Sequence, residues 1–154
     1  MKQIIGKTIM LVAVAAALVS FTNFGGEGFE IYLNNKVVMQ QYGESMNTVK
    51  SLRLNPNSAN DQLTVKYHHC GKVGKNRIIT IKDEKNKVVK EWRFADTATP
   101  VAAMNCNVKD ILNLAKKNET ELKLYYASSE LPNGRLLANI VVENNNVVIN
   151  KKAA

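Results

Sequence analysis

Short runs of alternating apolar and polar residues recur along most of the chain after residue 27. A period of two is typical of a β-strand that buries one face and exposes the other. The clearest run places Leu63, Val65 and Tyr67 on one face, with Thr64 and Lys66 on the other. The segments that we expect to form strands are 29–33, 36–42, 48–54, 62–69, 77–82, 87–94, 121–127, 135–142 and 147–149.

Turn-forming residues separate these segments. Asn34-Asn35 suits a two-residue hairpin turn, and residues 131–134 (Leu-Pro-Asn-Gly) predict another turn because Gly tolerates positive φ. Apolar residues at helical spacing over 108–116 predict one short helix, with Asn107 as a possible N-cap. Eight or nine short strands spaced by about ten residues favour an all-β fold. We expect residues 27–150 to form a single antiparallel β-sandwich of immunoglobulin-like or jelly-roll character.

The first 25 residues have the pattern of a secretory signal peptide. Lys2 and Lys7 precede an apolar stretch over 9–19, which is shorter than the roughly 20 residues of a membrane-spanning helix. Small residues place the cleavage site between 20 and 26. The sequence therefore predicts a protein that is secreted or periplasmic, with no stable membrane span after cleavage.

The chain has two cysteines, Cys70 and Cys106. Exported proteins fold under oxidising conditions, which favour pairing of thiols. We therefore expect a Cys70–Cys106 disulfide that links the strand ending near residue 69 to the segment before the predicted helix.

The stretch His68-His69-Cys70 holds both histidines of the chain and suggests an alternative, a metal site. Together with Met104 it supplies imidazole, thiolate and thioether groups, which suit copper, or zinc if Met104 is left out. A disulfide would use both thiolates, so it competes with this interpretation. The simpler hypothesis makes His69 a hydrogen-bonded residue of the core and His68 a surface residue beside Lys66.

The chain is basic, with 21 Lys and Arg against 13 Asp and Glu and a formal net charge of +8. The alternation turns several tyrosines and cations away from the apolar faces, which predicts a binding surface unless a second sheet covers them. Its possible partners are an anionic component of the cell envelope or surface, or another exported protein. The basic residues are scattered rather than clustered, so we do not expect a nucleic-acid partner. The candidate surface residues are Tyr32, Tyr42, Tyr125, Lys66, Arg93 and Lys123, with Lys82 as a further outward cation.

The sequence contains no known arrangement of catalytic residues and calls for no cofactor. The favoured hypothesis is an exported, non-enzymatic binding or interaction domain of unknown ligand. One alternative is an exported copper or zinc protein that uses His68, His69 and Cys70. Another is an enzyme whose catalytic residues are not recognisable in the sequence.

Overall fold

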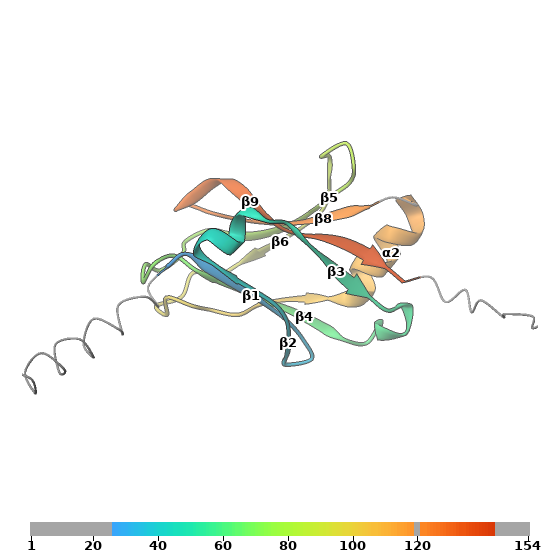
Figure 1. Ribbon diagram of the computed structural model, residues 1–154, viewed down its shortest axis with the longest axis horizontal. Coiled ribbons are helices and arrows are strands. Elements are labelled where there is room, and N and C mark those ends of the chain that lie inside the picture. The colour runs from blue at the N-terminus through green and yellow to red at the C-terminus, as the bar shows by residue number, and fades with distance from the viewer. Residues whose placement is uncertain (1–25, 119–120, 144–154) are drawn as a thin grey trace, which may run out of the picture.

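A computed structural model describes residues 26–118 and 121–143, which form two β-sheets stacked as layers (Figure 1). The strand order is β2-β1-β4-β7 in the four-stranded sheet and β3-β9-β8-β5-β6 in the five-stranded sheet. The four-stranded sheet contains β1 (Gly28–Leu33), β2 (Lys36–Tyr42), β4 (Gln62–His68) and β7 (Met104–Asn107). The five-stranded sheet contains β3 (Lys50–Leu54), β5 (Arg77–Lys82), β6 (Val88–Phe94), β8 (Leu122–Ser128) and β9 (Leu131–Val142).

The inward positions of the alternating segments form the core between the two sheets. Ile31 and Val65 of one sheet and Ile79 and Leu124 of the other are fully buried. This arrangement confirms the predicted all-β, sandwich-like fold. The expected signal peptide over 1–25 and the expected strand 147–149 lie outside the described residues.

The predicted helix is present as α2 (Val108–Asn118), and two short 3-10 helices, η2 (Gly43–Asn47) and η3 (Pro56–Ser58), lie between strands. Val108, Ile111 and Leu112 are buried, so the helix packs one side against the end of the sandwich, where Figure 1 shows it. Among the described residues, none of the helices has the length and apolar character needed to cross a membrane.

One strand pair differs from the antiparallel pattern that we expected. β3 pairs with β9 in parallel, with Leu52 opposite Ile140, whereas the other pairs are antiparallel. After β2 the chain passes through η2 into the other sheet, so β3 arrives there beside a strand from the end of the described chain. Alternation predicts which side chains point inward but contains no information on strand direction, which explains the difference.

The turn predicted at 131–134 is wrong in position. The hairpin turns at residues 129–130, and β9 already begins at Leu131. Gly134 has a φ of +67° and lies beside an irregularity in the pairing between Tyr126 and Ser128. A β-carbon at Gly134 would lie 3.1 Å from the carbonyl oxygen of Tyr126, so this glycine permits a bulge within the strand rather than a turn.

The expected disulfide is also wrong, because Cys70 and Cys106 both carry free thiols. In the β4–β7 register, Cys106 lies opposite Leu63, which precedes Cys70 by seven residues. At about 3.3 Å per strand residue, this offset separates the cysteines by roughly 20 Å. A disulfide requires α-carbons within about 7 Å. Cys106 is buried in the core, whereas Cys70 is exposed at a turn after β4, with a φ of +52°.

The two thiols should differ strongly in reactivity. We expect iodoacetamide to alkylate Cys70 alone in the folded protein, because burial raises the pKa of the Cys106 thiol to about 12 and shields it from the reagent. Intact-mass spectrometry should show one adduct under native conditions and two in denaturant, and no native adduct in Cys70→Ser. Labelling that requires prior reduction would instead demonstrate a disulfide.

Candidate functional site

The sequence His68-His69-Cys70 does not act as one unit in the folded protein. His68 is half-buried on the outer face of the four-stranded sheet, His69 points into the sandwich with 8% of its surface exposed, and Cys70 lies in the turn. Alternation along β4 sends the two histidines to opposite sides of the sheet, as the sequence predicted. The two histidines therefore belong to two separate groups of side chains, one on each side of the sheet.

On the outer face, strand register places a glycine between an aromatic ring and a histidine. Gly28 of β1 lies opposite both Tyr42 of β2 and His68 of β4. The Tyr42 ring lies across Gly28, where a β-carbon would be only 2.0 Å from the Cδ1 atom of Tyr42. The rings of Tyr42 and His68 then meet edge-to-face, with centroids 5.3 Å apart. Gly28 is thus the residue that allows these two side chains to touch.

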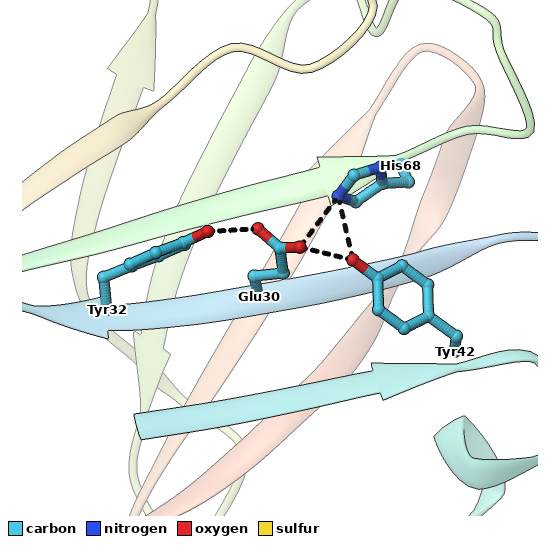
Figure 2. Close-up of polar contacts among 4 residues, drawn as sticks. All are labelled: Glu30, Tyr32, Tyr42 and His68. Atoms are coloured by element: carbon cyan, nitrogen blue, oxygen red, sulfur yellow. Dashed lines mark hydrogen bonds and ion pairs between the residues drawn. The ribbon is translucent and has the colours of Figure 1, made fainter. Parts of the chain in front are cut away.

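Glu30, Tyr32, Tyr42 and His68 form a hydrogen-bonded group that we call the Glu30 cluster (Figure 2). The Tyr32 hydroxyl donates to Oε2 of Glu30 and the Tyr42 hydroxyl donates to Oε1, each at 2.5 Å. Nε2 of His68 lies 3.3 Å from the Tyr42 oxygen and 3.8 Å from Oε1. Because Tyr42 gives its one hydroxyl hydrogen to Glu30, the contact with His68 requires a hydrogen on Nε2 of the imidazole.

The cluster holds a carboxylate between two neutral phenols. Burial alone raises the pKa of Glu30, but the hydrogen bonds from Tyr32 and Tyr42 and the nearby His68 and Lys66 lower it overall. The hydrogen bond to Glu30 raises the pKa of Tyr32. Burial, together with the same carboxylate, raises the pKa of Tyr42 to about 12. At neutral pH the Glu30 carboxylate is therefore ionised and both phenols are neutral.

This face combines hydrogen-bond acceptors with cations and aromatic rings. The ammonium of Lys66 lies 4.7 Å from the centroid of the Tyr32 ring, beside Glu30 in the β1–β4 register. Both phenol oxygens keep lone pairs that can accept further hydrogen bonds, and the four cluster side chains are only partly buried. Such a set can recognise hydroxyl-rich ligands by hydrogen bonding and by contact with aromatic rings.

Sequence reasoning identified most of this cluster but missed its central residue. Tyr32, Tyr42, Lys66 and His68 were all expected on outer faces, and the structure brings them together. Glu30 was not singled out, although alternation places it on the same face of its strand as Tyr32, two residues away. That spacing is the signal that could have identified it.

The other expected surface residues lie on the opposite outer face of the sandwich. Tyr125 and Lys123 of β8 and Arg93 of β6 belong to the five-stranded sheet. Arg93 forms an ion pair with Glu91 at 2.7 Å, and Lys123 donates to Asn86 at 3.0 Å. The single binding surface that the sequence suggested is therefore divided between two faces.

The residues proposed as metal ligands do not converge. Met104 is fully buried opposite Val65, and it faces the core, as His69 does, whereas His68 faces outward. Within the described residues, no group of three or more His, Cys, Asp or Glu side chains is arranged to hold a metal ion. The nearest carboxylate to His68 is that of Glu30, which two tyrosines already engage.

His69 belongs to a closed polar group that joins the two sheets. Its Nε2 lies 2.8 Å from the Tyr126 hydroxyl and 3.3 Å from the Ser128 hydroxyl, and Tyr126 stacks on Tyr67 with centroids 4.3 Å apart. A β-carbon at Gly74 would be 2.9 Å from the Tyr126 oxygen, so the group is tightly covered. Ser128 is 4% exposed, which withholds its hydroxyl from a substrate. This group therefore fits a structural role between the sheets.

A partly exposed ion pair borders this group. The Tyr67 hydroxyl donates to Glu27, and Arg135 binds the second carboxylate oxygen of Glu27 at 3.0 Å.

Burial lowers the pKa of His69 although Glu130 and Glu27 act in the opposite direction, so the imidazole is neutral in the folded protein near pH 7.

No protein-family model matches this sequence, and no curated protein matches it either.

Proposed function

We propose that this protein is an exported, non-enzymatic binding domain that uses the Glu30 cluster to bind a hydroxyl-rich ligand, a glycan. The observation that carries this proposal is a preordered polar and aromatic network on a solvent-facing sheet surface (Figure 2). Its side chains hold one another in place before any ligand arrives, which reduces the entropy lost on binding. Tyrosine supplies a large contact area with few rotatable bonds, as it does in antibody combining sites.

The hydrogen-bond inventory supports a glycan as the ligand class. Glu30 and the two phenol oxygens accept hydrogen bonds, while His68 and Lys66 can donate them. Sugar hydroxyls both donate and accept, so they match a face that presents both kinds of group. The face is an open sheet surface, which suits a sugar chain that approaches from solvent.

Export is supported by the N-terminal pattern of Lys2 and Lys7 followed by the apolar stretch 9–19. Because Cys70 and Cys106 are free thiols, no disulfide supports export. The N-terminal pattern is the one observation behind this part of the proposal. The intact mass of the protein recovered outside the cytoplasm should correspond to cleavage between 20 and 26. A cytoplasmic protein that keeps its first residues would contradict export and leave the binding proposal to be tested separately.

The binding proposal predicts a measurable role for the two phenol hydroxyls. Chitohexaose, cellohexaose and mannan can be titrated into the folded protein by isothermal calorimetry. A bound glycan should lose about fivefold in affinity in Tyr42→Phe, because the substitution removes one hydroxyl whose hydrogen bonding contributes about 1 kcal/mol. Tyr32→Phe should act in the same direction.

Tyr125→Phe is the matched control, since it removes a phenol hydroxyl on the other outer face. It should leave the affinity of the Glu30 cluster for these neutral glycans unchanged. The proposal fails if folded protein binds none of these glycans, or if binding persists equally in Tyr42→Phe and Tyr32→Phe.

A further inference from the structure

Two lysines face each other on the outer surface of the five-stranded sheet. Lys82 of β5 is directly opposite Lys123 of β8 in the antiparallel register. Like charges in directly opposed positions destabilise a sheet, so this pair opposes folding rather than favouring it. Within the described residues, neither ammonium has a carboxylate within 4.0 Å. Lys82 lies 4.2 Å from the Tyr125 ring centroid, and Lys123 reaches only the neutral amide of Asn86.

The row that contains these lysines continues across the sheet without negative charge. Lys123 is opposite Asn139 of β9, which is opposite Ser51 of β3, and Arg53 lies two residues further along β3. Glu91 lies on this face and forms an ion pair with Arg93 at 2.7 Å. Lys82 and Lys123 are thus two positive charges on neighbouring strands, and neither ammonium has a carboxylate within 4.0 Å among the described residues.

An open groove of about 200 Å³ is lined in part by Lys82, one of the two lysines. It runs from Lys82 and Val88 past Thr80 and Tyr125 to the segment 132–134 at the start of β9. Thr80 and Glu91 line its middle, so a ligand in the groove would meet a hydroxyl and a carboxylate one strand row away from the cations. The site thus has a positively charged end at Lys82 and a polar, partly aromatic lining beyond it.

We propose that this face is a second binding site, which takes an anionic polysaccharide, with an acidic group between Lys82 and Lys123 and sugar rings in the adjoining groove. Charge complementarity is the main argument, because one anion placed between the lysines would replace their repulsion by two attractions. A lysine ammonium is a compact point charge, whereas an arginine guanidinium is a planar group with paired donors. The lysine pair therefore suits a carboxylate, sulfate or phosphate substituent. Glu91 is exposed and can accept hydrogen bonds from neutral hydroxyls of the same polysaccharide.

The groove favours a polysaccharide over an anionic membrane. A bilayer presents a dense layer of negative charge, and Glu91 at the groove would repel it. A sugar chain can instead place its hydroxyls toward that carboxylate and its acidic group toward the lysines. The site is independent of the Glu30 cluster, since the two lie on opposite outer faces of the sandwich.

The test compares two variants of equal net charge. Lys82→Gln/Lys123→Gln removes the proposed site, whereas Lys36→Gln/Lys72→Gln removes two exposed lysines from outside this face. The first variant should fold at least as stably as the parent, because it loses a repulsive pair. A loss of binding would then not be explained by unfolding, which thermal denaturation would check.

Binding is measured by biolayer interferometry with polygalacturonate, dextran sulfate, neutral dextran and phosphatidylglycerol vesicles as separate probes. We expect one or both charged polymers to bind, with an affinity that falls between about 50 mM and about 500 mM salt because exposed charges are screened. Any binding of neutral dextran should be unchanged in Lys82→Gln/Lys123→Gln, because it would not use these charges. Lys82→Gln/Lys123→Gln should weaken binding at least tenfold, and Lys36→Gln/Lys72→Gln by less than about twofold. The two charged polymers separate a carboxylate preference from a sulfate preference.

Three results would overturn the proposal: equal losses in both variants, binding to vesicles but to neither charged polymer, or no binding at low salt. Equal losses of affinity in the two variants would show that binding depends on net charge and not on the position of the lysines. Tyr42→Phe should leave polyanion binding unchanged, so failure at this site and failure of the proposed glycan site on the Glu30 cluster can be told apart.

Discussion

Replacing Gly28 by alanine is expected to destabilise the protein by about 2 kcal/mol and to weaken glycan binding by about tenfold or more. The added β-carbon would lie 2.0 Å from Cδ1 and 2.6 Å from Cε1 of Tyr42, far inside van der Waals contact. Since Gly28 lies within β1, the backbone cannot move away without disturbing its pairing with β2 and β4. The Tyr42 ring must therefore rotate off the sheet, which breaks its hydrogen bond to Glu30 and its contact with His68.

Urea unfolding followed by the fluorescence of Trp92 gives the free energy of unfolding, and calorimetry gives glycan affinity. Gly26→Ala is the matched control, because a β-carbon there meets no atom within 4 Å. It also corrects for the general effect of alanine on the entropy of the unfolded chain. Wild-type stability and binding in Gly28→Ala would show that Tyr42 does not depend on this glycine.

Acidification from about pH 7 to about pH 5 is expected to destabilise the protein through His69. Burial lowers the pKa of this histidine below its ordinary value of 6.5, so the unfolded chain takes up a proton that the folded chain refuses. Stability is therefore fully present above pH 6.5 and is lost as the pH falls toward the folded-state pKa. The slope from one titrating group cannot exceed about 1.4 kcal/mol per pH unit.

The groups around His69 make this effect specific. Its ring faces the neutral hydroxyls of Tyr126 and Ser128, while Glu130 and Glu27 favour the charged imidazole more weakly than burial opposes it. The pKa values of Glu30 and Glu130 are lowered from 4.5, so their contributions to stability are lost only below that pH. Above pH 5, the change in the free energy of unfolding with pH is therefore attributed to His69 and not to these carboxylates.

Chemical denaturation at several pH values measures this dependence. In His69→Gln the slope between pH 6.5 and pH 5 should disappear, because glutamine does not titrate, although the variant will be less stable at every pH. His68→Gln changes a histidine on the outer face and should retain the slope. A parent protein whose stability is constant across this range would contradict the assignment.

Local patterns were sufficient to predict much of this protein. Alternation identified the described strands except β7 (Met104–Asn107), which is only four residues long and was not predicted. It also identified the inward direction of His69 and the outward direction of Tyr32, Tyr42 and Lys66. Helical spacing identified α2 within two residues of its observed end. These features depend on the period of a strand or a helix, which is a property of consecutive residues.

Other features depend on which strands become neighbours. The parallel β3–β9 pair, the separation of the two cysteines, the meeting of Tyr42 with His68 over Gly28, and the opposed Lys82 and Lys123 all follow from register between distant segments. A strand of alternating residues presents the same buried face to many possible partners and in either direction, so alternation cannot select among them. The sequence alone determined which side chains point out of each strand; only the tertiary structure decided which of them meet, because the packing of the whole core selects one register.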